Sequence, residues 1–234
     1  MTGRIAGVLF DLGGTLVDIR DYVGWSRIAR GLGWEVDSES LGHAFVEEMR
    51  EVDRPRPTAE LSEFWRGVLH RASGREVPEA VARGFLAEYE RAPQPVHLFS
   101  DVRRCLDALK DQGRALGIIS NSRSELHVRE LLQGVGILSY FTVTLSSGTE
   151  RILKPDAEIF QRGVHRLGVA PAQALYVGDL PYTDAWAAER AGLHGLWLNR
   201  EGTGLGSGAP EVTSLLEVPL WIQQLENENA SRRS

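Results

Sequence analysis

The 234-residue sequence is poor in cysteine and has no long apolar run. Its single cysteine, Cys105, excludes an internal disulfide, which is typical of a protein from a reducing compartment. No stretch approaches the ~20 consecutive apolar residues of a membrane span, and the first residues lack the apolar core of a signal peptide. The net charge of −6 gives no support for binding to nucleic acid or to an anionic membrane. We therefore expect a cytoplasmic protein with neither a nucleic-acid partner nor a membrane partner.

Lysine is also scarce, since only Lys110 and Lys154 occur although the chain has 26 basic residues. This bias makes a lysine in a chemically suitable place less expected by chance. Lys154 stands before Pro155, just ahead of a predicted helix over 156–167. Taken alone it indicates only a solvated loop charge, so its value depends on what lies near it in the fold.

Residues 19–95 carry helical rather than strand-like spacing. Apolar side chains recur at helical intervals over 21–32, 40–49 and 61–69, and a fourth helix opens at Val77. Four helices with short links predict a small bundle whose aromatic stripes form its core. Arg54 and Arg56 lie in one link, where a solvated position is more expected than a role in holding a second anionic group of a ligand.

Strands and helices alternate in the remaining residues, 1–18 and 96–234, which predicts an α/β unit with a parallel sheet. Cys105 lies on an amphipathic segment over 101–112 and is expected to be a core thiol. Near the C-terminus we expect a helix over 184–191, a glycine-rich loop over 201–210 and a short helix over 214–225 before a frayed polar tail. Short apolar runs predict strands over 8–10, 115–119, 141–145, 174–177 and 194–198.

Polar residues follow several of the predicted strands. Asp11 follows Val8–Phe10, the pair Ser120-Asn121 follows the strand ending at Ile119, and Asp179 follows the strand ending at Val177. Parallel strands joined by right-handed crossovers place such ends at one edge of the sheet, where open α/β sheets bind ligands. We therefore expect the carboxylates of Asp11 and Asp179 and the Ser120 hydroxyl to converge there. Lys154 and Asp184, which lie in the segments that follow, are expected to join them.

These residue types suit phosphoryl transfer. Asp11 and Asp179 offer hard oxygen ligands for Mg²⁺, and Asp11 can also attack phosphorus to form an aspartyl-phosphate that water hydrolyses. The Ser120 hydroxyl suits phosphate oxygens, and Lys154 offsets the charge of nucleophile and phosphate. Asp184 is placed to hold Asp179, a water or the lysine. Each residue alone also fits an ordinary turn, cap or surface position, so the combination carries the prediction.

With these four segments the chain resembles the haloacid dehalogenase superfamily of hydrolases. The matching pieces are residues 10–16, Ile119-Ser120-Asn121, Lys154-Pro155, and Gly178-Asp179 through Asp184. The resemblance implies a Rossmann-like core from residues 1–18 and 96–234, with residues 19–95 as a helical cap inserted after the first motif. It also implies Mg²⁺ and phosphatase activity on a small phosphorylated molecule.

The resemblance assigns roles to these residues. Asp11, Ser120 and Lys154 are the expected catalytic residues, and Ser120, Asn121 and Lys154 the expected substrate-binding residues. Asp11, Asp179 and Asp184, with the backbone carbonyl of Gly13, are the expected metal ligands. We expect a monomer or a homodimer.

Gly13 is a departure from the family pattern. Phosphatases of this family have a second aspartate two residues after the nucleophile, which serves as general acid and base, and here that position is Gly13. General acid–base catalysis is worth roughly 10²–10⁴ in rate, so turnover is expected to be slow.

Three functions stay open at this point. The first is a Mg²⁺-dependent phosphatase. The second is a non-catalytic phosphate-ligand or protein-binding module on the same fold, which the missing acid favours. The third is a dehalogenase-type hydrolase without a metal, which fits poorly because Asp179 and Asp184 are both present.

Overall fold

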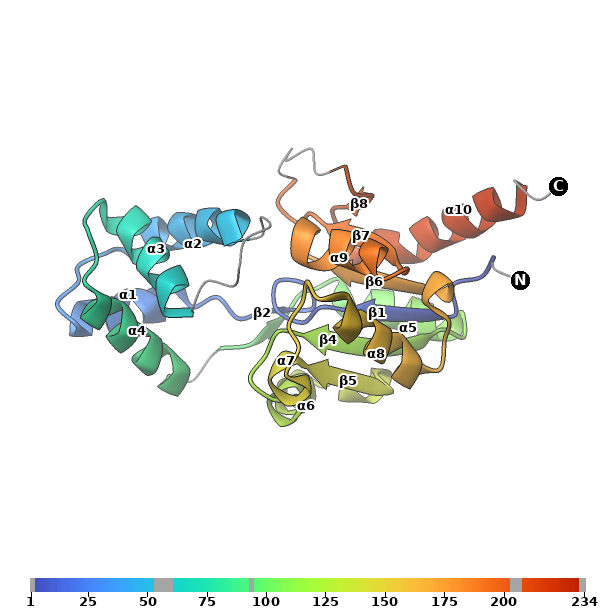
Figure 1. Ribbon diagram of the computed structural model, residues 1–234, viewed down its shortest axis with the longest axis horizontal. Coiled ribbons are helices and arrows are strands. Elements are labelled where there is room, and N and C mark those ends of the chain that lie inside the picture. The colour runs from blue at the N-terminus through green and yellow to red at the C-terminus, as the bar shows by residue number, and fades with distance from the viewer. Residues whose placement is uncertain (1–2, 53–60, 93–94, 203–207, 232–234) are drawn as a thin grey trace. The chain divides into compact units, whose positions relative to one another are not determined.

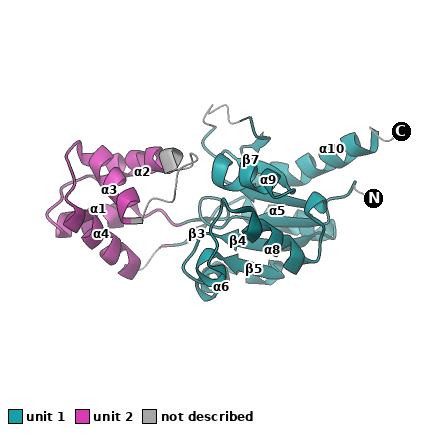
Figure 2. Cartoon of the chain, in the orientation of Figure 1, with its two compact units in different colours: residues 1–18, 96–234 teal, residues 19–95 magenta. Residues whose placement is uncertain are grey.

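The computed structural model describes residues 3–52, 61–92, 95–202 and 208–231 (Figure 1). The chain forms two compact units, residues 1–18 with 96–234 and residues 19–95 (Figure 2). The first unit is an α/β unit and the second is helical. None of the helices in the described part of the chain has the length and apolar character needed to span a bilayer.

The α/β unit is built on a parallel sheet of six strands in the order β5-β4-β1-β6-β7-β8. This confirms the predicted fold class. β1 lies between β4 and β6 and all four of its residues are buried, because helices cover both faces of the sheet (Figure 1). The strands are β1 (Gly7–Phe10), β4 (Ala115–Ser120), β5 (Val143–Ser146), β6 (Ala174–Gly178), β7 (His194–Leu198) and β8 (Glu211–Val212).

One face of the sheet packs against α8 (Ala157–Leu167) and α9 (Ala187–Arg190), and the other lies toward α5 (Val102–Asp111) and α10 (Val218–Ser231) (Figure 1). Successive strand residues point to opposite faces, so Leu9 joins the α8 side while its neighbours do not. Cys105 is buried on α5, which confirms its expected place in the core. Two further α-helices belong to the described part of this unit, α6 (Glu125–Gly134) and α7 (Ser147–Glu150).

The second unit contains α1 (Tyr22–Gly31), α2 (Ser38–Val52), α3 (Leu61–Ser73) and α4 (Glu79–Arg91). Its core is aromatic, as the helical spacing predicted, and Trp65 lies at its centre. The Trp65 ring lies 5.0 Å from that of Trp25 and 4.7 Å from that of Phe85, which are distances of favourable ring packing. Arg54 and Arg56 lie outside the described residues.

The two passages of the chain between the units form a short antiparallel ribbon that the sequence did not predict. It consists of β2 (Val17–Asp18) and β3 (His97–Leu98), with Val17 opposite Leu98 and Asp18 opposite His97. Two-residue strands are too short to show an alternation of apolar and polar residues, so the sequence pattern gives no sign of them.

Two segments near the C-terminus differ from the prediction. The helix expected from residue 184 begins at Pro181 with a π-helical turn over Pro181–Trp186, and α9 follows it. The tail expected to fray is helical to Ser231 in α10. Its anchor is Glu226, which accepts hydrogen bonds from Arg114 at 2.9 Å and from the backbone nitrogen of Ile5 at 2.7 Å.

Candidate active site

Four of the five side chains predicted to converge at the carboxyl ends of the strands lie together in the structure, and the fifth, Ser120, is the last residue of β4. Phe10 of β1 pairs with Ile118 of β4 and Val177 of β6, so these three strands end within two residues of one another at the same edge. Asp11 follows directly, and its backbone nitrogen donates to the carbonyl of Val177 at 2.9 Å. Asp179 stands at the corresponding place after β6. The site is therefore positioned by β1 and β6, two central strands of the sheet whose residues are all buried.

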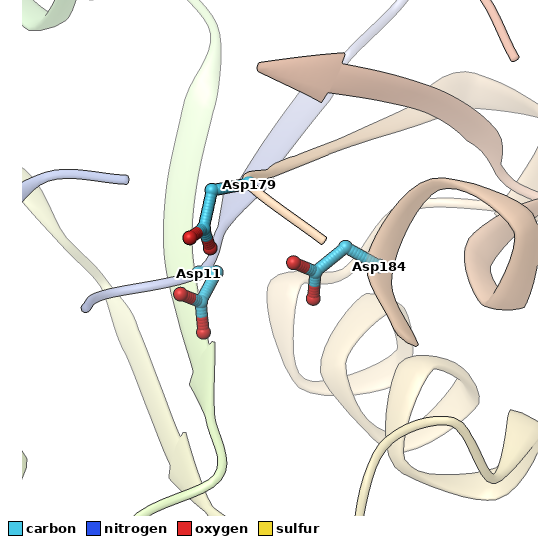
Figure 3. Close-up of side chains that lie close together, drawn as sticks. All are labelled: Asp11, Asp179 and Asp184. Carbon is cyan, nitrogen blue, oxygen red and sulfur yellow. The ribbon is translucent and has the colours of Figure 1, made fainter. Parts of the chain in front are cut away.

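Three aspartates gather at this edge, namely Asp11, Asp179 and Asp184. One carboxylate oxygen from each lies within 4.8 Å of the other two. Figure 3 shows Asp11 and Asp179 close together, with the carboxylate of Asp184 directed toward them from the following helical turn. Asp11 and Asp184 are buried, and Asp179 is half-buried.

Lys154 joins two of these acids. Its ammonium nitrogen Nζ lies 2.7 Å from Oδ1 of Asp11, 2.6 Å from Oδ1 of Asp184 and 2.8 Å from the hydroxyl of Tyr176. A lysine has three N–H donors, so these contacts use all of them. The side chain is buried, and it is an ion-paired group of the site rather than a solvated loop charge.

The backbone around Lys154 is held by Asn121. The amide oxygen of Asn121 accepts from the Lys154 nitrogen at 2.9 Å, and its Nδ2 donates to the Lys154 carbonyl at 3.0 Å. Both ends of this side-chain amide are thus engaged with the protein. Ser120 precedes it as the buried last residue of β4, and its neighbour Ile119 accepts a hydrogen bond of 2.9 Å from the Tyr176 hydroxyl.

Burial and the neighbouring charges shift the pKa values of the site residues. Burial raises the pKa of Asp11 to about 6, although the Lys154 ammonium opposes the shift. Burial and the charges of Asp11 and Asp184 raise the pKa of Asp179 well above its usual range. Burial lowers the pKa of Lys154, but Asp11 and Asp184 outweigh it, so that the pKa is raised and the group stays an ammonium.

The carboxylates of the site fit a hard divalent cation. Three carboxylates face one ammonium, and the Asp179 carboxylate accepts a hydrogen bond of 3.4 Å from the Thr15 hydroxyl, a neutral group. Carboxylate oxygens are the ligands that Mg²⁺ prefers, and a cation among them would offset both the burial and the carboxylate repulsion that raise the pKa of Asp179.

The turn after β1 brings its backbone against this cluster. Gly14 has a φ of +75°, and a β-carbon there would lie 2.2 Å from Oδ2 of Asp179. Only glycine meets both conditions, since other residues are strained at such a φ and have no space here. Gly13 lies outside the left-handed region and offers the site backbone atoms alone.

The structure thus brings Asp11, Lys154 and Asp184 into direct contact, with Asp179 beside them and Asn121 supporting the lysine. Tyr176 is a member of the site that the sequence did not predict. Its signal was a single hydroxyl in the otherwise aliphatic run 174–177, which the sequence predicts to be a buried strand.

The chain is similar in sequence to known hydrolases. A family model of haloacid dehalogenase-like hydrolases matches residues 5–192. Phosphoserine phosphatase of Thermus thermophilus is 30% identical over 191 residues, which cover 77% of this chain and 73% of that protein. Glyceraldehyde 3-phosphate phosphatase of Pyrococcus furiosus is 25% identical over 238 residues, which cover 97% of this chain and 96% of that protein.

A solved structure shares the fold. A predicted phosphoglycolate phosphatase from Haemophilus somnus superimposes with a TM-score of 0.71 at 24% identity, covering 95% of this chain and 99% of its own. At this identity the likeness concerns the architecture.

Proposed function

This chain belongs to the haloacid dehalogenase-like hydrolase family, and we propose that it is a Mg²⁺-dependent phosphatase of small phosphorylated molecules. The observation that carries the proposal is the Lys154 ammonium between Asp11 and Asp184, with Asp179 beside them. The names of the two relatives, which specify phosphoserine and glyceraldehyde 3-phosphate, support a small phosphomonoester as substrate.

Asp11 is the proposed nucleophile. Its carboxylate attacks the phosphorus atom, the bond from phosphorus to the ester oxygen breaks, and the alcohol leaves after taking a proton from solvent. A water molecule then attacks the aspartyl-phosphate, which releases inorganic phosphate and restores the carboxylate. The raised pKa of Asp11, about 6, still leaves the carboxylate ionised at neutral pH.

Lys154 contributes its positive charge. Because its three N–H groups are engaged with Asp11, Asp184 and Tyr176, it orients the nucleophile and reduces the repulsion between carboxylate and phosphate. The Ser120 hydroxyl is the proposed donor to the phosphate oxygens. Asn121 contributes by fixing the backbone of Lys154.

Asp11, Asp179 and Asp184, with the Gly13 carbonyl, would hold the Mg²⁺. When bound, the ion supplies electrostatic stabilisation of the negative charge on the transferring phosphoryl group. The Gly13 position lacks an acid, so the leaving group takes its proton without a positioned side chain. This is why we expect slow turnover.

The proposal is tested by phosphate release from a panel of small phosphomonoesters, measured with Mg²⁺ and with a chelator. Asp11→Asn is expected to abolish release, whereas the exposed Asp111→Asn serves as the matched control and is expected to leave it unchanged. Equal release by wild type and Asp11→Asn would show that Asp11 is not the nucleophile.

Gly13 favours a second candidate, a phosphate-binding module without turnover on the same fold. It predicts binding of inorganic phosphate but no release from any phosphomonoester. A dehalogenase-type hydrolase predicts instead the release of halide in the presence of chelator, and the same panel extended with 2-haloacids would reveal it.

A further inference from the structure

We propose that Tyr176 is a positioning residue, whose hydroxyl fixes the Lys154 ammonium against Asp11. The contact is observed, while its importance for turnover rests on the proposed function of Lys154. Tyr176 lies on β6, fully buried, two residues before the strand ends at Gly178. It is thus part of the central sheet and has a fixed place relative to Asp11, which follows the neighbouring β1.

The hydroxyl links Lys154 to strand β4 by two hydrogen bonds. It accepts a hydrogen bond from Nζ of Lys154 at 2.8 Å and donates one to the carbonyl of Ile119 at 2.9 Å. Its one proton is therefore directed toward β4, which leaves its lone pairs facing the ammonium. The ring is held by Phe160, with ring centres 4.9 Å apart at 79°, so the hydroxyl has little freedom to move.

The Tyr176 hydroxyl orients the ammonium group of Lys154. Two of the ammonium protons point to Asp11 and Asp184, and the third needs an acceptor because Lys154 is buried. The Tyr176 hydroxyl is that acceptor. Without it the third N–H would be unpaired, and the ammonium would turn to satisfy it at the expense of its contact with Asp11.

Packing alone does not explain a tyrosine here. A phenylalanine would fill the same space against Phe160 and would not bury a hydroxyl, which costs free energy unless it is hydrogen-bonded. The two partners of the hydroxyl, Lys154 and Ile119, both lie at the edge of the sheet that carries the site. The phenol thus adds a connection between the lysine and the strand that ends at Ser120.

The near absence of lysine allows a direct test. Labelling lysine with ¹³C and ¹⁵N gives signals from Lys154 and from the exposed Lys110, which is an internal reference. In Tyr176→Phe we expect the Nζ and Cε signals of Lys154 to shift and its ammonium protons to exchange with water at least about tenfold faster, with Lys110 unchanged. Unchanged Lys154 signals would overturn the proposal.

Tyr140→Phe is the matched control. It also removes a tyrosine hydroxyl from a hydrogen bond within the α/β unit, the one to Asp107 on the surface, and is expected to leave the Lys154 signals in place. Thermal unfolding confirms that each variant is folded at the measuring temperature. If Tyr176→Phe does not fold, Tyr176→Met removes the same hydroxyl with a more adaptable side chain.

Kinetics supply a second readout. Tyr176→Phe is expected to lower kcat about tenfold with a smaller change in KM, because the misplaced charge matters most in the transition state. An unchanged kcat would contradict the positioning role. If the wild type hydrolyses no phosphomonoester, the proposed function fails, and the lysine spectra still decide whether Tyr176 fixes Lys154.

Discussion

Arg200 donates a hydrogen bond of 2.7 Å from Nη2 to the backbone carbonyl of Thr15. The same guanidinium holds Asp101 through both terminal nitrogens, at 2.9 and 3.1 Å, and lies over the ring of Phe99 at 4.0 Å. Asp101 also accepts from the Ser214 hydroxyl at 2.9 Å. The turn that carries the glycines of the site is therefore secured from the carboxyl end of β7.

Replacing Arg200 by methionine is expected to lower the free energy of unfolding by about 2 kcal/mol, since Asp101 is left largely buried without its cation. Burial alone would raise the pKa of Asp101, but its hydrogen bonds from Arg200 and Leu215 outweigh this, so the pKa is lowered. The stabilisation is thus present above the unfolded pKa of about 3.9 and is lost as the pH falls through the folded value.

Urea unfolding followed from neutral to acidic pH checks this prediction. The difference between wild type and Arg200→Met is expected to shrink in acid. Arg83→Met is the control, because it breaks an exposed pair with Glu79 that is worth only about 0.3–0.5 kcal/mol. If Arg200→Met lowered the free energy of unfolding no more than the control does, the role of Arg200 would be contradicted.

Gly14→Ala is expected to lower the rate of phosphate release by at least about tenfold, because the new methyl group displaces the Asp179 carboxylate. Gly168→Ala is the matched control, with a φ of +73° against +75° and no atom within 4 Å of the added carbon. Both variants carry a backbone strain of about 1–2 kcal/mol. Phosphate assays and thermal unfolding of the pair separate this strain from the displacement, and equal activity in both would refute the prediction.

Gly13→Asp is expected to raise kcat about 10²-fold or more, since it adds a group that can protonate the leaving oxygen. The backbone at Gly13 is not in the left-handed region, so its φ imposes no strain on an aspartate. Gly13→Asn has the same shape without the proton and should stay slow. Turnover in neither wild type nor Gly13→Asp would favour the binding module over the enzyme.

The Cys105 thiol is expected to react slowly with iodoacetamide in the native protein. Burial, with a smaller effect of the Asp101 charge, raises its pKa to about 12, so the reactive thiolate is scarce and inaccessible. Because the folded pKa lies above the unfolded one, this contribution to stability is complete below about pH 8.5 and falls as the pH rises toward the folded value. The rate of alkylation of Cys105 at about pH 8.5, measured with and without urea, tests the expected protection of the thiol. Equal rates in the native and the unfolded protein would contradict it.

The parts of the site that follow from sheet geometry could be predicted from the sequence. Asp11 and Asp179 each follow a buried apolar run, and parallel strands bring such ends to one edge whatever their separation along the chain. The fold class followed from the same alternation of strands and helices. Lys154 was added because its charge suits phosphoryl transfer, because Lys154-Pro155 resembles the family pattern, and because a lysine is rare in this composition.

The remaining features depend on contacts between distant residues that periodicity does not record. The expected substrate contact of Asn121 stays a prediction, and the structure adds that its side-chain amide holds the backbone of Lys154. Tyr176 lies in an apolar run that predicts a buried strand, and the contact of its hydroxyl with Lys154 becomes visible only in the structure. The helical tail near Glu226 depends on Arg114, which lies more than a hundred residues earlier.

Val17 and Leu98 face each other in the β2–β3 ribbon, so the chain departs from the α/β unit and returns to it at adjacent backbone positions. Antiparallel neighbours of this kind are near enough to be joined by a tight hairpin turn. Residues 19–95 are therefore inserted between two adjacent backbone positions, and they interrupt the chain without interrupting the order of strands in the sheet that carries the aspartates.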